Sequence, residues 1–160
     1  MVPDAASWWA HRMLQASKTN VWSGTYEVTL DGRPVTTWTR RPWRSGGSFD
    51  LDGRRFEVHS NFWGGRFDLS AEDGGKVAAA DRVGRTRWNV QADGHRYEFV
   101  RASAWSGEQS LLDDGGKRVG SIRRVSPWRA DTEADLPGVP VLVQVFALIV
   151  VLATWESQSG

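Results

Sequence analysis

Apolar and polar residues alternate with a period of two along much of the chain. Residues 25–30 (TYEVTL) place an apolar side chain at every second position, which predicts a strand with one buried face. Asp31-Gly32 follows, and a second run of the same kind covers 34–39. Asp-Gly between two such runs predicts a tight hairpin, because a type I′ turn needs a positive φ at both central positions.

The same strand–turn–strand unit recurs four more times before residue 125. Two copies resemble each other closely, since EDGGKVAAADR and DDGGKRVGSIRR share a DGGK turn and a basic end. Hairpins at this regular spacing predict an antiparallel sheet of ten or more short strands. The Asp-Gly pairs lie at 31–32, 52–53, 73–74, 93–94 and 114–115. The remaining glycine pairs, at 46–47 and 64–65, are also expected in turns.

The C-terminal part has a different pattern. Residues 139–155 (VPVLVQVFALIVVLATW) are an apolar run with a single strongly polar side chain, Gln144, and 17 residues are too many for an ordinary strand. As a helix they would span about 25 Å, with Pro140 near the first turn, where proline is tolerated. Apolar side chains on all sides of a helix require burial in protein or in lipid.

The sequence is compatible with either environment, protein or lipid, for residues 139–155. In a bilayer they would be a tail anchor, although the length is at the lower limit for a span and few basic residues flank it. Inside the protein they need a shell, and a barrel of more than eight strands needs a filler. We therefore favour a mainly β fold, a closed antiparallel barrel of about 10–12 strands around a buried hydrophobic C-terminal helix.

The domain boundaries follow from this interpretation. Residues 1–20 are expected to be an N-terminal arm, with a short helix over 4–17 that Asp4 caps. Residues 21–156 are expected to form a single barrel domain that includes the central helix. At 160 residues the chain is long enough for one such core.

The hairpin series, the two DGGK units and the terminal LPGVPVLVQVFALIVVLATW together resemble the tubby C-terminal-like superfamily. That superfamily also includes phospholipid scramblases and the LURP-one-related proteins. The resemblance covers roughly residues 20–156 and implies a barrel of about twelve strands around a hydrophobic helix. It carries over no individual site residue, so what it implies about lipid binding stays an expectation.

Composition excludes several kinds of chemistry. The net charge is only +1, so no nucleic-acid partner is expected. Cysteine is absent, which removes disulfides and thiolate sites. The first residues, MVPDAASWWAHR, lack the pattern of a signal peptide. We expect a cytoplasmic protein, and a monomer is favoured.

No motif indicates catalysis. The three histidines, His11, His59 and His95, are far apart in the sequence and lack the spacing of metal ligands. Nucleophile-elbow, Walker A and dinucleotide motifs are also missing from the sequence. We therefore expect no enzyme activity, no cofactor and no metal site.

Basic and aromatic residues are combined in two segments, TWTRRPWRSGG and RRVSPWRA. Each has Arg-Arg followed by Pro-Trp-Arg at the end of an expected strand. Arginine binds phosphate through its fork of donors, and tryptophan favours membrane interfaces. If both segments lie at one rim, they would form a site for anionic lipid or phosphate. The candidate residues are Arg40, Arg41, Trp43, Arg44, Arg123, Arg124, Trp128 and Arg129.

These features favour a non-enzymatic binding or membrane-peripheral module whose partner is an anionic membrane lipid or another protein. Two alternatives remain at this point. One is a tail-anchored protein with residues 139–155 in the bilayer. The second is a small-ligand carrier or enzyme with a site at the barrel mouth.

Overall fold

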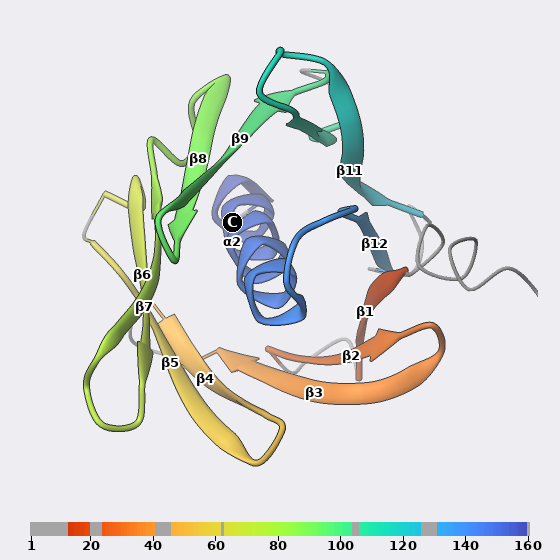
Figure 1. Cartoon of the computed structure of the whole chain (residues 1–160). Coiled ribbons are helices and arrows are strands. Elements are labelled where there is room, and N and C mark those ends of the chain that lie inside the picture. The colour runs from red at the N-terminus through yellow and green to blue at the C-terminus, as the bar shows by residue number, and fades with distance from the viewer. Residues whose placement is uncertain are drawn as a thin grey trace, which may run out of the picture.

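A computed structural model describes residues 13–19, 24–40, 46–61, 63–103, 106–125 and 131–159. Within them, twelve antiparallel strands close into a barrel around a helix, α2, as the sequence predicts (Figure 1). Strands that are consecutive in the chain are neighbours in the barrel, and β1 pairs with β12 to close it. The elements are β1 (Leu14–Lys18), β2 (Thr25–Leu30), β3 (Arg33–Arg40), β4 (Gly46–Leu51), β5 (Arg54–Ser60), β6 (Arg66–Ala71), β7 (Lys76–Asp81), β8 (Arg87–Ala92), β9 (His95–Arg101), β10 (Gln109–Leu112), β11 (Arg118–Arg124), β12 (Thr132–Asp135) and α2 (Val141–Ser159).

All five expected hairpins form. In the β2–β3 turn, Asp31 and Gly32 both have positive φ, 51° and 82°, which is the geometry of a type I′ turn. The turns β4–β5 and β8–β9 repeat it with the Asp-Gly pairs at 52–53 and 93–94. The five turns lie at the end of the barrel where α2 begins, and we call this end the turn rim.

The two DGGK turns differ although their sequences match. In the β6–β7 turn, Asp73 Oδ1 accepts a hydrogen bond from the amide two residues later at 2.8 Å, and Gly74 has φ 89°. In the β10–β11 turn the corresponding carboxylate belongs to Asp113, and Gly116 has φ 83°. The glycine in the left-handed region is thus the first of the pair in one turn and the second in its copy.

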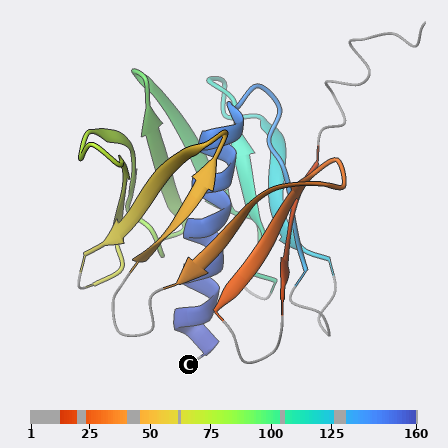
Figure 2. The same cartoon turned by 90° about the horizontal axis from the view of Figure 1, so that it is seen from below.

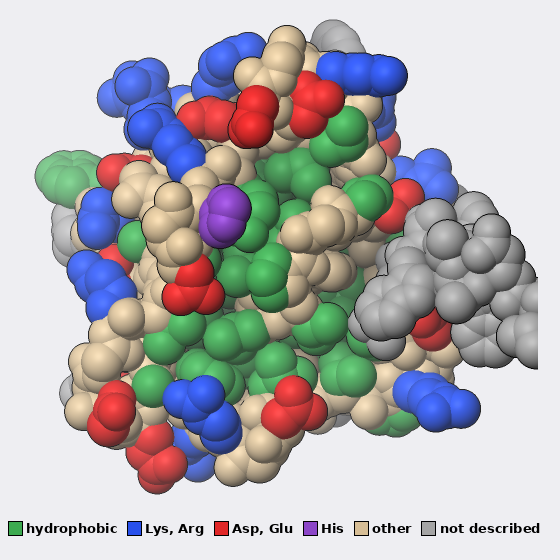
Figure 3. All heavy atoms as spheres, viewed as in Figure 1, with side chains coloured by type: hydrophobic (Ala, Val, Ile, Leu, Met, Phe, Trp, Pro, Cys, Tyr) green, Lys and Arg blue, Asp and Glu red, His purple; other side chains and the backbone are tan. Residues whose placement is uncertain are grey.

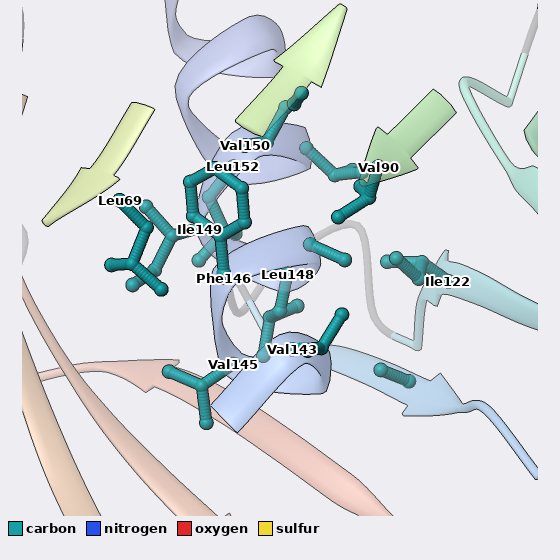
Figure 4. Packing of buried hydrophobic residues seen from close by; sticks show 14 of the residues in the cluster. Leu69, Val90, Ile122, Val143, Val145, Phe146, Leu148, Ile149, Val150 and Leu152 are labelled. Carbon is teal, nitrogen blue, oxygen red and sulfur yellow. The ribbon is translucent and has the colours of Figure 1, made fainter. Parts of the chain in front are cut away.

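Helix α2 fills the barrel (Figure 2). Every residue from Val145 to Val150 is fully buried, and Leu69, Val90 and Ile122 from the wall point toward the helix (Figure 4). The prediction of a protein-buried helix is therefore confirmed. Among the described elements, no helix is long and apolar enough to cross a bilayer.

The N-terminal prediction was partly wrong. A helix was expected over 4–17, but Leu14–Lys18 is strand β1, and residues 4–12 lie outside the described residues. Leu14 and Ala16 are fully buried while Gln15 is exposed, so the alternation fits a strand between β2 and β12. The barrel consequently begins at Leu14 and not at residue 21.

The glycines at 46–47 also depart from expectation, because they lie in strand β4 and not in a turn. A Cβ on Gly47 would be 2.2 Å from the carbonyl oxygen of Thr39 and 2.7 Å from the ring of Trp38. Glycine is therefore needed here for the close approach of β3 and β4 under the buried Trp38.

Candidate binding surface at the loop rim

The end of the barrel opposite the turn rim is formed by longer connections and by the end of α2. We call it the loop rim. It receives the connections β1–β2, β3–β4, β5–β6, β7–β8, β9–β10 and β11–β12, because antiparallel strands alternate in direction. Figure 2 shows α2 ending at this rim. Connections of this kind carry binding residues more often than tight two-residue turns do.

Two of the candidate arginines meet at the loop rim. Arg40 ends β3 and its Nη1 lies 2.7 Å from Oε2 of Glu156 in α2. Arg124 ends β11 and stacks on the ring of Trp155, with 4.5 Å between the guanidinium carbon and the ring centroid. The two strand ends that the sequence singled out thus contact adjacent residues of the helix.

Arg123, the third candidate that the structure describes, is not part of this contact. Arg123 pairs with Glu133 of β12, with 3.5 Å between Nη2 and Oε2. The last five candidates, for which the structure gives no placement, lie outside the described residues: Arg41, Trp43, Arg44, Trp128 and Arg129.

Glu156 accepts hydrogen bonds from two strands. The hydroxyl of Tyr26 in β2 donates to Oε1 at 2.7 Å, and Arg40 donates to Oε2. Burial raises the pKa of Tyr26, and the hydrogen bond to the negatively charged Glu156 raises it further, whereas Arg40 and Arg124 act in the opposite direction. The hydrogen bonds from Tyr26 and Arg40 to Glu156 therefore attach the end of α2 to strands β2 and β3.

A second set of hydrogen bonds connects α2 to the β9–β10 connection. Trp155 Nε1 and Gln109 Nε2 both donate to the carbonyl oxygen of Gly107, each at 3.2 Å. Trp88 Nε1 in turn donates to Gln109 Oε1 at 2.8 Å. A Cβ on Gly107, which has φ 70°, would lie 2.7 Å from Trp155 Nε1. The floor of the loop rim is therefore a hydrogen-bonded layer that leaves little freedom to the two indoles.

The structure adds basic residues that the sequence analysis did not select. The β7–β8 connection and the first residue of β8 carry Arg82, Arg85 and Arg87, and all three side chains are exposed. None of the three makes an ion pair with another described residue, in contrast to Arg40. Arg82 has φ 60°, a conformation that is uncommon for a residue with a side chain.

Exposed apolar side chains accompany these arginines. Trp63, in the β5–β6 connection, is 86% exposed, and Val125, directly after β11, is 50% exposed. Both belong to connections of the loop rim. A mixture of arginine with exposed tryptophan and aliphatic side chains is typical of surfaces that contact a membrane interface.

A small pocket opens between the β7–β8 connection and the end of α2. Its volume is about 40 Å³. Arg85 and Arg101 are its charged lining residues, and Trp88, Gln109 and Trp155 are among the others. Arg101 Nη2 lies 3.4 Å from Thr86 Oγ1, so the end of β9 and the β7–β8 connection are also joined by a side-chain hydrogen bond.

A larger, open trough of about 520 Å³ lies on the outer wall over β7 and β8. Its cationic lining residues have acidic partners in the wall. Arg66 contacts Asp68 and Asp81, Lys76 contacts Asp68, and Arg96 contacts Glu98, at 2.7–3.5 Å. The trough is therefore a less favourable site for an anion than the loop rim.

The turn rim has a different character. Figure 3, which views the barrel as Figure 1 does, shows apolar side chains at the centre, ringed by acidic and basic ones. Aspartates occupy the turns themselves, and exposed arginines such as Arg33 and Arg54 follow them directly, so the charge of this rim is mixed. In the described part of the chain, no group of three or more His, Cys, Asp or Glu side chains is placed to hold a metal. The five turn aspartates that carry positive φ or accept a turn hydrogen bond are Asp31, Asp52, Asp73, Asp93 and Asp113.

Comparisons with known proteins support the fold and no more. No family model matches the sequence, and no curated protein matches it. A solved structure of a protein from Arabidopsis thaliana is similar, with a TM-score of 0.60, 11% sequence identity and coverage of 91% of both chains. At this identity the similarity establishes a shared closed barrel with a C-terminal helix.

Proposed function

We propose that this protein is a non-enzymatic module of the tubby-like superfamily that binds anionic membrane surfaces peripherally through its loop rim. The observation that carries the proposal is the exposed arginine group of the β7–β8 connection on the rim that also presents Trp63 and Val125. The barrel around a C-terminal helix supports the superfamily assignment, on which the proposal depends only for its fold.

Electrostatics favours this end of the barrel. Each arginine close to an anionic leaflet contributes about 1 kcal/mol, and the contribution falls off within a Debye length. The loop rim presents Arg82, Arg85 and Arg87 without acidic partners among the described residues. The turn rim, with its aspartates, faces away in this orientation. Because anionic lipids are concentrated in the cytoplasmic leaflet, we place the protein on that side.

The apolar residues supply a second, salt-independent contribution. The ring of Trp63 combines an apolar body with one donor, which suits the headgroup level of a bilayer. Val125 extends the apolar contact on a neighbouring part of the rim. Binding is therefore expected to weaken with salt without disappearing.

The proposal is tested by sedimentation with vesicles of phosphatidylcholine, with and without phosphatidylserine. We expect the wild type to bind the anionic vesicles and Arg82→Gln/Arg87→Gln to bind them about tenfold or more weakly, as two surface charges predict. The matched control Arg33→Gln/Arg54→Gln removes the same charge from the turn rim and should bind like the wild type.

Two results would contradict the proposal. The first is an equal loss in both double variants, since that would mean that net charge and not the loop rim determines binding. The second is no binding of the wild type to anionic vesicles at low salt, where the attraction is strongest.

A further inference from the structure

We propose that the turn rim is a self-complementary interface through which two copies of this chain pair end to end. The dimer would carry a loop rim at each end, so that it joins two anionic membranes. The pairing stands on its own, whereas the joining of membranes rests on the proposed function. The monomer favoured from the sequence gives way here to a dimer, because the fold gathers partly exposed apolar side chains at one end of the barrel.

The partly exposed apolar part of the core lies at the turn rim. In the described chain, eight partly buried apolar residues pack against the core. Seven of them lie within three residues of an Asp-Gly turn or in the first turn of α2, whereas the eighth, Ala153, lies near the end of the helix. The aliphatic ones at this rim are Leu30, Val35, Ala71, Val77, Val141 and Leu142. An apolar centre with a charged surround, as in Figure 3, is typical of a protein–protein interface.

The charges around this apolar centre alternate in sign. In each of the five hairpins an exposed aspartate belongs to the turn, and an exposed arginine or lysine lies at or beside the start of the next strand. Asp93 precedes Arg96 in this way, and Asp113 precedes Lys117. Because consecutive strands are neighbours in the barrel, acid and base follow one another around the rim. Asp93 and Lys117 make no ion pair with another described residue, so their charges are available to a partner.

A second copy of this chain fits such a surface. A partner with charges of one sign would meet a like charge at every second position of the ring, which is unfavourable. Two alternating rings that face each other bring acids opposite bases once one ring is rotated by half a spacing about the barrel axis. A two-fold dimer uses the same patch of both copies and so allows this arrangement. Exposed ion pairs contribute little individually, so the charges set the register and the apolar centre supplies most of the affinity.

The pairing has a geometric consequence for the end that binds membranes. Helix α2 runs from the turn rim to the loop rim (Figure 2), and its 19 residues span about 28 Å. Two barrels joined at their turn rims therefore place their loop rims at opposite ends, roughly 60 Å apart. One flat bilayer cannot contact both loop rims, so the dimer would hold two membranes together.

Sedimentation velocity tests the pairing without any membrane. We expect the wild type at micromolar concentration to sediment with twice the 17.9 kDa mass of one chain. Leu142→Glu should raise the dissociation constant of the dimer about hundredfold or more, because a two-fold interface loses the apolar contact twice. A glutamate in the first turn of a helix is favourable, so the variant should keep its melting temperature. The control Val125→Glu makes the same kind of change at the loop rim and should leave the dimer intact.

Carbodiimide coupling maps the interface in the wild type alone and so does not depend on the folding of a variant. The reagent joins carboxylates to amines, and the chain has only three lysines, Lys18, Lys76 and Lys117. In a mixture of unlabelled and isotope-labelled protein, we expect mixed-label peptides that join Lys76 or Lys117 to turn aspartates. Lys18, at the loop-rim end of β1, should form none. A monomeric wild type, a Leu142→Glu variant that still pairs, or mixed-label peptides from Lys18 alone would overturn the interface.

The turbidity of phosphatidylserine vesicles tests the joining of membranes. The wild type should cluster the vesicles, whereas Leu142→Glu should bind them without clustering. Binding of a wild-type dimer without clustering would overturn the joining of membranes. A dimer that binds no vesicles would overturn the proposed function, and the joining with it, but leave the interface. Vesicle binding by a monomeric wild type would overturn the interface and leave the proposed function intact.

Discussion

Individual side chains at the end of α2 decide how firmly the helix is attached to the barrel. Glu156 is shared between Tyr26 and Arg40, and Trp155 is held between Gly107 and the guanidinium of Arg124. A hydrogen bond to a charged group contributes more than one between neutral groups. The attachment is therefore polar at the rim, although the helix itself is held by apolar packing.

The Tyr26–Glu156 hydrogen bond predicts a pH dependence of stability. Because burial and Glu156 raise the pKa of Tyr26 in the folded protein above its ordinary value of 10, its contribution is fully present below pH 10 and is lost as the pH rises further. We expect the melting temperature of the wild type to fall more steeply above about pH 10 than that of Tyr26→Phe. Thermal melts at neutral and alkaline pH measure this, and parallel curves for the two proteins would contradict it.

The functional residues were predicted only in part from the sequence. Arg40 and Arg124 were selected for their place in Arg-Arg segments, and both lie at the loop rim, but each has a partner in α2. Arg85 and Trp63 were missed because they lie more than twenty residues apart and share one rim only because the β6–β7 hairpin returns the chain to it. A search for tryptophan beside arginine along the sequence cannot find such a pair.

Among the secondary-structure elements, the hairpins and the helix could be predicted from local sequence patterns, whereas the two strands that close the barrel could not. The five hairpins were predictable because Asp-Gly needs left-handed backbone, which the turns adopt. Helix α2 was predictable from the length of its apolar run. Strands β1 and β12 were not, since each is short and offers only two buried inward side chains: Leu14 and Ala16 in β1, and Thr132 and Ala134 in β12. Their pairing with each other becomes favourable only when the remaining strands are in place.

The close packing of β3 against β4 predicts how a substitution at Gly47 changes stability. Gly47→Ala should lower the free energy of unfolding by about 1–3 kcal/mol, because the added methyl group would overlap Thr39 and the Trp38 ring. Gly65→Ala is the control, since its nearest neighbour would be 4.0 Å away, and it should change stability by less than about 0.5 kcal/mol. Urea denaturation of both variants measures the difference. Equal stability would show that β3 and β4 can separate without cost.

For the whole molecule, the barrel wall and its filler depend on each other. Ten apolar residues of α2, from Val143 to Trp155, are buried, and at about 2 kcal/mol each their burial contributes roughly 20 kcal/mol. That exceeds the usual net stability of a domain, about 5–15 kcal/mol. The wall alone is therefore not expected to fold.

Deletion of residues 136–160 tests this dependence. The truncated chain should show no cooperative thermal transition and should aggregate, because the inward side chains of twelve strands would lose their contacts. Circular dichroism and calorimetry measure the transition. A soluble truncated protein that melts cooperatively would show that the strands collapse into an alternative core.

The seam between β1 and β12 also determines when the protein can fold during synthesis. The barrel closes by pairing its first strand with its last, and the helix that fills it follows that last strand in the chain. Hairpins that leave the ribosome early therefore carry apolar faces with nothing to cover them until α2 emerges. Long-range contacts of this kind slow folding and expose strand edges to aggregation. Nascent chains stalled before α2 should thus be preferred clients of holdase chaperones, and release of the full chain should end that dependence.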